Sequence, residues 1–510
     1  MDRYTPSIDE AVKFAGQYNY MPVKREIFSD ICTPIQALRK LRAVSDHVFM
    51  LESVENQENW GRYTFLGFNP RLCFTCLNGH LTVTRDDGAV VDDLTIRHPG
   101  EYIKDIVKKY KSPMIEDFPS FTGGLVGYFA YDYIKYSEPS LNLYAEDEEH
   151  FKDMDLMLFD KVIAFDNVKQ KIVIIANVKI ADREAVLLAG QDDYVPDEAG
   201  IRADYERAVK DIDEIAQILT NGKEADIEKG RMTSSYRALF DKDEFCKMVN
   251  RGKDHIREGD IFQVVLSNRL EADFSGSLFD MYRMLRTINP SPYMFYFSGD
   301  DVEVAGASPE TLVKIKDGYV HTFPLAGTRR RGANEKEDKE LEAELLSDEK
   351  ECAEHNMLVD LGRNDIGRIS EFGTVEVEKY MSIERFSHVM HIGSTVKGKL
   401  RERLGQLDAI DAILPAGTLS GAPKIRACEI INELENNKRG IYGGAIGYID
   451  FMGNLDTCIA IRIAFKKNGK VFVRSGAGIV ADSVPENEYE ECLNKAKAVM
   501  TAIEKAQEMD

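Results

Sequence analysis

The sequence predicts an α+β protein built on antiparallel sheets. Three dipeptides, Asn78-Gly79, Asp317-Gly318 and Asn468-Gly469, each lie between two runs of alternating apolar residues. Such a pair between two strands is the strongest short-range signal for a two-residue β-hairpin. Because hairpins join antiparallel strands, the pattern disfavours a doubly wound parallel sheet.

Periodicity predicts the other elements. Residues 443–475 are typical of a meander of about three strands. Apolar residues recur at helical spacing in residues 204–219, 243–257, 335–361 and 487–508. Helical stretches therefore separate groups of strands that hairpins connect.

The chain divides near its middle. Residues 180–237 are polar, charged and poor in strand signals. We therefore predict an N-terminal region over residues 1–200, a linker over 201–239 and a C-terminal region over 240–510.

Composition restricts the class of partner. The formal net charge of the 510 residues is -22, so the surface as a whole disfavours nucleic acid and anionic membranes. An anionic substrate would need a local cluster of cations or a metal. We find no run of about 18 apolar residues that would span a membrane, and the first ten residues lack the basic and apolar regions of a signal peptide.

The eight cysteines point to a reducing, cytoplasmic setting. Cys73 and Cys76 form a C-x-x-C, but a zinc site would need a second such pair. We therefore expect both to be thiols of one strand.

Two glycine-rich stretches resemble nucleotide motifs and are rejected. "GAGIVA" at 476–481 fits G-x-G-x-x-A, but a proline-containing loop follows it where a dinucleotide site needs a helix. "GTLSGAPK" at 417–424 has three residues between its glycines, one fewer than a phosphate loop. Both remain turns whose N–H groups could meet an anion.

Two pairs of glutamates have helical i, i+3 spacing: Glu351 with Glu354, and Glu488 with Glu491. That spacing puts both carboxylates of a pair on one face of a helix. Two facing pairs would form an oxygen site suited to Mg2+, which keeps waters and takes only one or two carboxylates directly. The alternative is a solvated helix face, and spacing alone does not exclude it.

Two further side chains are candidates for acid–base chemistry. Glu310 follows a proline on a turn that leads into a strand, and a partly desolvated carboxylic acid there could be a general acid. His391 lies in the stretch "HVMHIGSTV". Both also have ordinary interpretations, as a turn residue and as a structural histidine.

Taken together, these segments resemble the chorismate-utilising enzymes. The resemblance covers residues 240–506 throughout and is carried by the stretches "GDIFQVVLS", "GASPETL", "PLAGTRRRG", "EHNMLVDLGRNDIGR", "HVMHIGSTV", "LPAGTLSGAPK", "YGGAIGY", "AIRIA", "SGAGIVADS" and "EYEECLNKA". "MLESVENQENWGRYTFLG" and "NPSPYMFYF" resemble the tryptophan-binding elements of the family's anthranilate-forming members.

The resemblance implies a fold. Two large antiparallel sheets would pack as a sandwich with helices outside, and the N- and C-terminal halves would be intertwined. Residues 1–200 would be a regulatory region and residues 240–510 the chorismate-binding catalytic domain.

It also implies the roles of individual residues. Glu354 and Glu491 would bind Mg2+ directly, and Glu351 and Glu488 would bind it through water. The ring end of chorismate would lie against Gly327 and Thr328, with Thr418 close by. Tyr442, Arg462 and the N–H groups of Gly476, Ala477 and Gly478 would hold the enolpyruvyl carboxylate. His391 would lie at the ring hydroxyl that leaves, and Glu310 would be the acid that assists its departure.

Two positions indicate the nucleophile. Relatives that make aminodeoxychorismate have a nucleophilic lysine where this chain has Ala326, and relatives that add water have a lysine base where it has Gln263. Neither residue here can play those parts, whereas ammonia needs neither. The prediction is therefore anthranilate formation from chorismate and ammonia. An aminodeoxychorismate-forming enzyme and a non-catalytic tryptophan sensor are the alternatives.

The remaining expectations concern partners and control. We find no glutaminase elbow in the sequence, and the resemblance implies a separate glutamine amidotransferase subunit that supplies ammonia, in a heterotetramer. An inhibitory tryptophan site would be lined by Glu52, Ser53, Pro292, Tyr293 and Met294.

Overall fold

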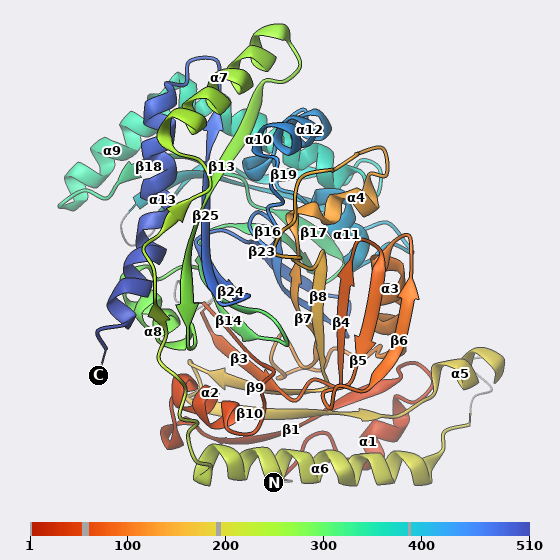
Figure 1. Ribbon diagram of the computed structural model, residues 1–510. Helices are drawn as coiled ribbons and strands as arrows, with labels where there is room; N and C mark the ends of the chain where they lie inside the picture. Colours follow the sequence, from red (N-terminus) through yellow and green to blue (C-terminus); the bar gives the residue numbers. More distant parts are fainter. Residues whose placement is uncertain (1–2, 54–60, 190–194, 386–388, 510) are drawn as a thin grey trace.

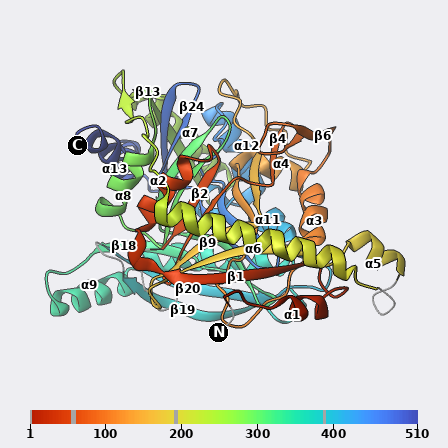
Figure 2. The same cartoon turned by 90° about the horizontal axis from the view of Figure 1, so that it is seen from below.

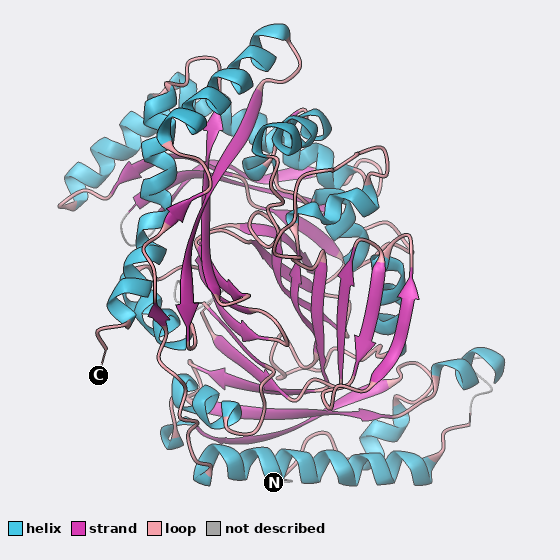
Figure 3. Cartoon of the chain, in the orientation of Figure 1, coloured by secondary structure: helices cyan, strands magenta, loops and turns pink. Residues whose placement is uncertain are grey.

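The computed structural model describes residues 3–53, 61–189, 195–385 and 389–509. Within these residues the strands form two large sheets, and helices cover their outer sides (Figures 1 and 3). The predicted α+β class, with two antiparallel sheets packed as a sandwich, is confirmed.

The first sheet has 13 strands within the described ranges. Its N-terminal strands are, in spatial order, β1 (Tyr20–Phe28), β10 (Lys171–Lys179), β9 (Lys161–Asp166), β3 (Tyr63–Phe68) and β2 (Val48–Glu52). The order continues with β14 (Tyr293–Ser298), β15 (Glu303–Ser308), β24 (Ile463–Lys467), β25 (Lys470–Ile479), β13 (Gln263–Ser275) and β11 (Arg231–Met232). The short strands β12 (Arg237–Ala238) and β21 (Gly421–Ala422) also pair with β13.

The second sheet has 12 strands in the same part of the chain. It begins with β18 (Leu325–Arg330), β20 (Val389–Lys399), β17 (Tyr319–Thr322), β16 (Thr311–Lys316), β23 (Leu455–Ile459) and β22 (Ala445–Asp450). It ends with β7 (Gly124–Phe129), β8 (Met154–Phe159), β4 (Leu72–Leu77), β5 (His80–Thr84) and β6 (Val90–Thr95), and β19 (Glu376–Arg385) pairs with β20.

Each sheet contains strands from both halves of the chain, as the sequence predicts. In the first sheet β2 pairs with β14, with Glu52 opposite Met294. In the second sheet β7 pairs with β22, with Gly127 opposite Gly447. A Cβ atom on Gly447 would lie 2.1 Å from the carbonyl oxygen of Asp456 on β23, and one on Gly127 would lie 2.0 Å from that of Asp155 on β8, so the neighbouring strands require glycine at both positions.

The three predicted hairpins are confirmed. They join β4 to β5, β16 to β17 and β24 to β25. Asn468 and Gly469 have φ angles of 52° and 72°, and the other two pairs are similar. Positive φ at both central residues gives the turn a twist that matches that of the strands. Cys73 and Cys76 are both buried, unpaired thiols of β4, as expected.

The predicted helices are present, with one difference. Residues 204–219, 243–257 and 487–508 correspond to α6 (Glu198–Asn221), α7 (Lys242–Glu258) and α13 (Pro485–Ala506). Residues 335–361 form two helices, α9 (Glu335–Ser347) and α10 (Glu349–Gly367). Asp348 separates them because its ψ of 104° is extended and its carboxylate caps the N–H groups of Lys350 and Glu351.

Shorter helices complete the fold. They are α1 (Ile8–Lys13), α2 (Pro34–Arg42), α3 (Pro99–Lys109), α4 (Ile134–Ser137), α5 (Arg183–Ala189), α8 (Phe279–Ile288), α11 (Gln406–Ile413) and α12 (Lys424–Glu435). No described helix is both long and apolar enough to cross a membrane.

Helix α6 lies along the outside of the first sheet, against β10 (Figure 2). Its apolar face, which includes Ile212, Ile215 and Leu219, is fully buried there. Most of the segment expected to be a linker is therefore packed helix. The division into a regulatory region, a linker and a catalytic domain stays a prediction.

The expected meander at residues 443–475 differs from the prediction in its course. Strands β22 and β23 belong to the second sheet, whereas β24 and β25 belong to the first. The chain crosses between the sheets at residues 460–462, and it crosses again at 309–310, between β15 and β16. The two crossovers lie side by side, since Ala307 N donates to Arg462 O at 3.1 Å and Ile459 N donates to Glu310 O at 2.9 Å.

Candidate active site

A cavity of about 720 Å³ lies at these crossovers. Strands of both sheets and the helices α10 and α13 contribute to its wall (Figure 1). The residues singled out in the sequence that line it are Gln263, Glu310, Ala326, Gly327, Thr328, Glu351, Glu354, His391, Thr418, Tyr442, Arg462, Gly476, Gly478, Glu488 and Glu491. Residues far apart in the chain are thus collected in one place.

The two pairs of glutamates face the same cavity from different helices. Glu351 and Glu354 lie on α10, and Glu488 and Glu491 lie on α13. Burial raises the pKa of Glu354 above its usual value, and the neighbouring Glu351 raises it further. Burial also raises the pKa of Glu488, with Glu491 adding to the effect. The cavity therefore disfavours unbalanced negative charge on both helices.

Some of these carboxylates already have cationic neighbours. Glu491 forms an ion pair with Lys495, one turn later on α13, at 2.7 Å. Glu351 lies 3.5 Å from the guanidinium group of Arg329. The side chain of Gln263 is near enough to Glu354 to lower its pKa slightly, so the position expected to distinguish the nucleophile lies beside a candidate metal ligand.

Glu310 lies in the crossover between β15 and β16. Thr418, in the 3-10 turn Gly417–Leu419, donates a hydrogen bond from its hydroxyl to Oε1 of Glu310 at 3.1 Å. Burial raises the pKa of Glu310 to about 7, although Thr418 opposes this rise. Near neutral pH a large fraction of Glu310 is therefore protonated and can donate a proton.

His391 and the stretch 326–328 face each other across the pair β18–β20. Nδ1 of His391 lies 2.9 Å from the carbonyl oxygen of Gly327 and 3.1 Å from the hydroxyl of Thr328. A carbonyl only accepts, so we assign the proton to Nδ1. Burial lowers the pKa of His391, which favours a neutral ring. The register shifts between Ala326 and Thr328, and Gly327 has a φ of 64° at this bulge.

Another part of the cavity wall is suited to an anion. Arg462 lies in the crossover at residues 460–462, and Tyr442 precedes β22. Gly476 and Gly478 belong to β25 and line the cavity, whereas Ala477 between them is fully buried and is not among the lining residues. Burial lowers the pKa of Arg462, as expected for a cation held in a largely enclosed place.

Two lysines in the cavity were not predicted from the sequence. Lys495 donates to the carbonyl oxygen of Gly476 at 3.0 Å as well as pairing with Glu491. Lys350 lies next to Glu351 at the start of α10. The i, i+4 spacing of Glu491 and Lys495 puts both on one helix face and could have revealed the first of them.

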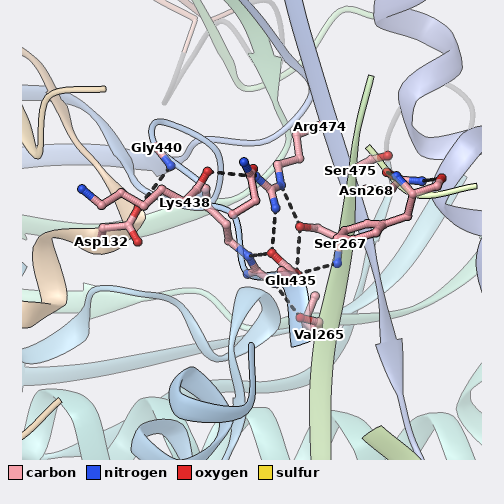
Figure 4. A network of polar contacts seen from close by, with 12 residues as sticks. Asp132, Val265, Ser267, Asn268, Glu435, Lys438, Gly440, Arg474 and Ser475 are labelled. Atoms are coloured by element: carbon pink, nitrogen blue, oxygen red, sulfur yellow. Dashed lines mark hydrogen bonds and ion pairs between the residues drawn. The ribbon is translucent and has the colours of Figure 1, made fainter. Parts of the chain in front are cut away.

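A buried charge cluster lies against the cavity wall, and Figure 4 shows Glu435 at its centre. The carboxylate of Glu435 pairs with Arg439 and Arg474, and all three residues are at most 2% exposed. Arg439 also donates to the carbonyl oxygens of Leu419, at 2.6 Å, and Val265, at 2.7 Å. Although burial opposes ionisation, the two arginines hold the pKa of Glu435 below its usual value.

This cluster joins three segments of the wall to helix α12. Glu435 is the last residue of α12, whereas Val265 on β13, Leu419 after Thr418 and Arg474 on β25 all line the cavity. The guanidinium group of Arg439 also lies 5.9 Å from the ring centre of Tyr442. Apart from the i, i+4 spacing of Glu435 and Arg439, the sequence gives no local signal for the cluster, because Arg474 lies 39 residues from Glu435 and Val265 lies 174 residues from Arg439.

The arginine run at 329–331 is not a free basic patch. Arg329 donates to Glu344 and Asp348, each at 3.0 Å. Arg330 pairs with Glu337 and Arg331 pairs with Asp338. The run therefore connects β18 to the acidic face of α9 and to the start of α10.

A second cavity, of about 780 Å³, is lined by all five residues expected to bind tryptophan: Glu52, Ser53, Pro292, Tyr293 and Met294. The hydroxyl of Tyr293 donates to Asp456 at 2.8 Å. Part of the motif that follows Ser53, residues 54–60, lies outside the described residues.

One loop borders both cavities. Asn289 and Ser291 line the first cavity, and Pro292, Tyr293 and Met294 line the second. The loop follows α8 and leads into β14. A displacement of this loop in one cavity would therefore reach the other cavity within a few residues of the chain.

Elsewhere, in the ranges that the structure describes, His255, Glu258 and Asp260 bring possible metal-ligating atoms within 4.8 Å of one another. Asp260 already accepts hydrogen bonds from Arg426 at 2.8 Å and from His255 at 2.9 Å. This group is balanced by its own cation and is exposed at Glu258, so we assign no metal to it.

Comparison with known proteins supports this arrangement. The family described as chorismate binding enzyme matches residues 47–501. The chain belongs to the chorismate-binding enzyme family. This membership agrees with a cavity that collects the family's motifs from across the C-terminal half.

Individual relatives narrow the placement within the chorismate-binding enzymes. Anthranilate synthase component 1 of Acetivibrio thermocellus is 46% identical over 99% of this chain and 100% of its own length. The crystal structure of anthranilate synthase component I from Streptococcus pneumoniae has a TM-score of 0.73 and 38% identity, and the match covers 93% of this chain and 98% of that chain. The menaquinone-specific isochorismate synthase of Escherichia coli shares the fold, with a TM-score of 0.66 at 18% identity over 97% of this chain and 100% of its own.

We expect Glu435→Gln to lower the free energy of unfolding by about 3–5 kcal/mol, because two buried guanidinium groups would lose the carboxylate that balances them. Denaturation by urea, followed by circular dichroism, measures the change. Glu335→Gln is the control, since its exposed pair with Lys339 on α9 contributes only about 0–1 kcal/mol. Equal losses in the two variants would contradict the role given to Glu435.

Proposed function

We propose that the protein is the large subunit of an anthranilate synthase. It would convert chorismate and ammonia into anthranilate, pyruvate and water, in the biosynthesis of tryptophan. The observation that carries the proposal is the first cavity, which brings together an acid with a raised pKa, four further carboxylates and an arginine among glycines. The full-length relatives named anthranilate synthase component 1 support it.

Binding would use two parts of the cavity wall. Chorismate carries two carboxylates, and Arg462, Tyr442 and the backbone N–H groups of residues 476–478 would bind the one on its enolpyruvyl group. In the other part, Gly327 and Thr328 would lie against the ring. Gly327 fits this close approach, because a Cβ atom there would lie 3.0 Å from Leu345 and 3.3 Å from Glu351.

Mg2+ suits the carboxylates of α10 and α13. The donors are oxygens, and the raised pKa values of Glu354 and Glu488 indicate negative charge that a divalent cation would balance. Glu354 and Glu491 would bind the ion directly, with Glu351 and Glu488 acting through water. When bound, Mg2+ would hold the ring carboxylate and withdraw the charge that develops beside it.

Residues of the chain would donate the proton that the leaving hydroxyl needs and would position that hydroxyl. Hydroxide is a poor leaving group, so Glu310 would protonate the ring hydroxyl as it leaves as water. His391, held through Nδ1, would lie beside that hydroxyl. Ammonia would form the new C–N bond next to the carboxylate-bearing carbon. The attacking nitrogen would release one proton, which balances the proton donated by Glu310. The amino intermediate would then lose a ring proton and the enolpyruvyl group, which takes up a proton to become pyruvate.

The positions of Ala326 and Gln263 support ammonia as the nucleophile. Ala326 has no amine to attack the ring, and Gln263 cannot accept a proton at neutral pH. Lys495, the amine that does lie in the cavity, is bonded to Glu491 and to the carbonyl oxygen of Gly476. Lys495 therefore connects α13 to β25 in the cavity wall and is not a free amine.

We further propose that a separate glutamine amidotransferase subunit supplies the ammonia, in a heterotetramer. The second cavity would be the site of feedback inhibition by tryptophan. Glu52 and Ser53 would bind the polar end of tryptophan, and Tyr293 and Met294 would pack on its indole ring.

The purified chain should form anthranilate from chorismate, Mg2+ and an ammonium salt at alkaline pH, where free ammonia is more abundant. The fluorescence of anthranilate measures the reaction, and chromatography separates it from aminodeoxychorismate. Glutamine should not replace ammonium with the chain alone. Turnover with glutamine, or aminodeoxychorismate as the final product, would refute the corresponding part of the proposal.

Replacing a metal-binding glutamate should remove activity without unfolding the chain. We expect Glu354→Gln and Glu491→Gln each to lower kcat/KM for chorismate by at least about 100-fold, the effect typical of losing a group that stabilises a transition state. Glu349→Gln and Glu490→Gln, at exposed positions on the same two helices, are matched controls. Full activity in Glu354→Gln would rule out the metal assignment.

The pH dependence should report Glu310. Because the protonated form acts and its pKa is about 7, kcat/KM calculated on free ammonia should fall as pH rises through about 7. Glu310→Gln should lower the rate by about 10²–10⁴-fold and abolish this fall. Thr418→Val should move the fall to higher pH, since the hydrogen bond from Thr418 lowers the pKa of Glu310. An unchanged profile in Glu310→Gln would exclude Glu310 as the acid.

A further inference from the structure

The carboxylate of Glu52, on the wall of the second cavity, is held by a single helix. The hydroxyl of Tyr282 donates to it at 2.6 Å, and Arg286 donates from both Nε and Nη2, the latter at 3.0 Å. Tyr282 and Arg286 are one turn apart on α8, so both project from the same face. Glu52 is 9% exposed, so its carboxylate is largely shielded from water, whereas the side chain of Arg286 is 31% exposed.

The same helix packs against the catalytic cavity. Helix α8 contacts α13 (Figure 1). Met281, Tyr282 and Leu285 belong to the apolar core that also contains Ala496 and Val499 of α13. Ala496 and Val499 in turn line the first cavity, on the helix that carries the candidate metal-binding glutamates.

The end of α8 provides a second connection. Asn289 closes the helix by donating its N–H to the carbonyl oxygen of Leu285 at 2.9 Å, and the same residue lines the first cavity. Three residues later the chain lines the second cavity. A displacement of α8 would thus reach the first cavity both through α13 and through this loop.

We propose that the Glu52–Arg286 ion pair transmits the binding of tryptophan in the second cavity to the catalytic cavity, through α8. The inference rests on the proposed function, because it takes tryptophan to be the ligand of the second cavity. The ammonium group of an amino acid would approach Glu52 and compete with Arg286 for its charge. The carboxylate would then hold α8 less tightly.

This competition supplies what allosteric inhibition requires. A ligand shifts an equilibrium only by interacting differently with two states, and here the difference is whether Glu52 holds the helix or the ligand. The coupling is reciprocal, so chorismate should weaken the binding of tryptophan by the same factor by which tryptophan weakens the binding of chorismate.

The test is Arg286→Met in the full-length chain, which removes the charge and keeps the length of the side chain. Tryptophan binding is measured by equilibrium dialysis, with and without saturating chorismate and in the absence of ammonium. Inhibition is measured in the ammonium-dependent assay. In the wild type we expect chorismate to change the Kd of tryptophan by about 5–150-fold, the range typical of allosteric coupling.

In Arg286→Met we expect tryptophan to bind as tightly as in the wild type or more tightly. Because α8 is then released without ligand, basal kcat/KM for chorismate should fall toward the value of the tryptophan-inhibited wild type. The effect of chorismate on the Kd of tryptophan, and inhibition by saturating tryptophan, should be largely lost. Arg283→Met is the matched control. It lies on the same helix, but its guanidinium group bonds Asp280 of α8 itself, at 2.8 Å, so inhibition should remain complete.

The outcomes separate this inference from the proposed function. If the wild type does not bind tryptophan, the proposed role of the second cavity fails. If the wild type is inhibited and Arg286→Met is inhibited equally, or no longer binds tryptophan, the coupling role of Arg286 is overturned. Should Arg286→Met not fold, Tyr282→Phe removes the other bond to Glu52 and should weaken inhibition. Unchanged inhibition in that variant would equally overturn the inference.

Discussion

Two backbone hydrogen bonds between the crossovers decide where the chemistry of this fold lies. They join Ala307 to Arg462 and Glu310 to Ile459 at the point where the chain leaves one sheet for the other. A strand that changes sheets must break its ladder, and the freed residues need new partners. Each crossover satisfies the other, so Glu310 and Arg462 are fixed on neighbouring segments at the boundary of the two sheets.

The buried cluster around Glu435 supports this boundary from the other side. Arg439 donates to carbonyl groups on β13 and on the turn that carries Thr418, and Thr418 in turn bonds Glu310. A buried carboxylate between two arginines is costly to desolvate and is stable only when its geometry is well satisfied. Ser267 donates to Glu435 from both its N–H and its hydroxyl group, which meets that condition.

The sequence predicted those parts of the structure that local physics determines. The Asn-Gly and Asp-Gly turns defined three hairpins, because positive φ at two successive residues admits few other structures. Helical spacing located α6, α7 and α13. It missed the break at Asp348, where a cap competes with helix continuation, and it did not anticipate that residues 443–475 change sheets at 460–462.

Sequence motifs identified many of the residues that line the candidate site, but not all of them. The glutamates, His391 and Glu310 were found through quoted motifs, and the structure brings them to one cavity. Lys495 and the partners of Glu435 were not found. The i, i+4 spacing from Glu491 could have revealed Lys495. In contrast, Ser267 and Arg474 contact Glu435 from 168 and 39 residues away, which no local pattern records. Tertiary packing, not local propensity, also decides that α8 contacts both Glu52 of the second cavity and helix α13 of the first.

The charges that line the first cavity explain why a metal would be needed there. Five carboxyl groups, Glu310, Glu351, Glu354, Glu488 and Glu491, face four cationic side chains, Lys350, Arg462, Arg474 and Lys495. Arg474 is already balanced by Glu435, and Lys495 by Glu491. A dianionic substrate would therefore enter a place with little spare positive charge, in a chain whose net charge is -22. Arginine and backbone donors can bind one carboxylate of such a substrate, but the second would lie against glutamates. A divalent cation between them turns that repulsion into attraction, so binding of the substrate and of the metal should be mutually dependent.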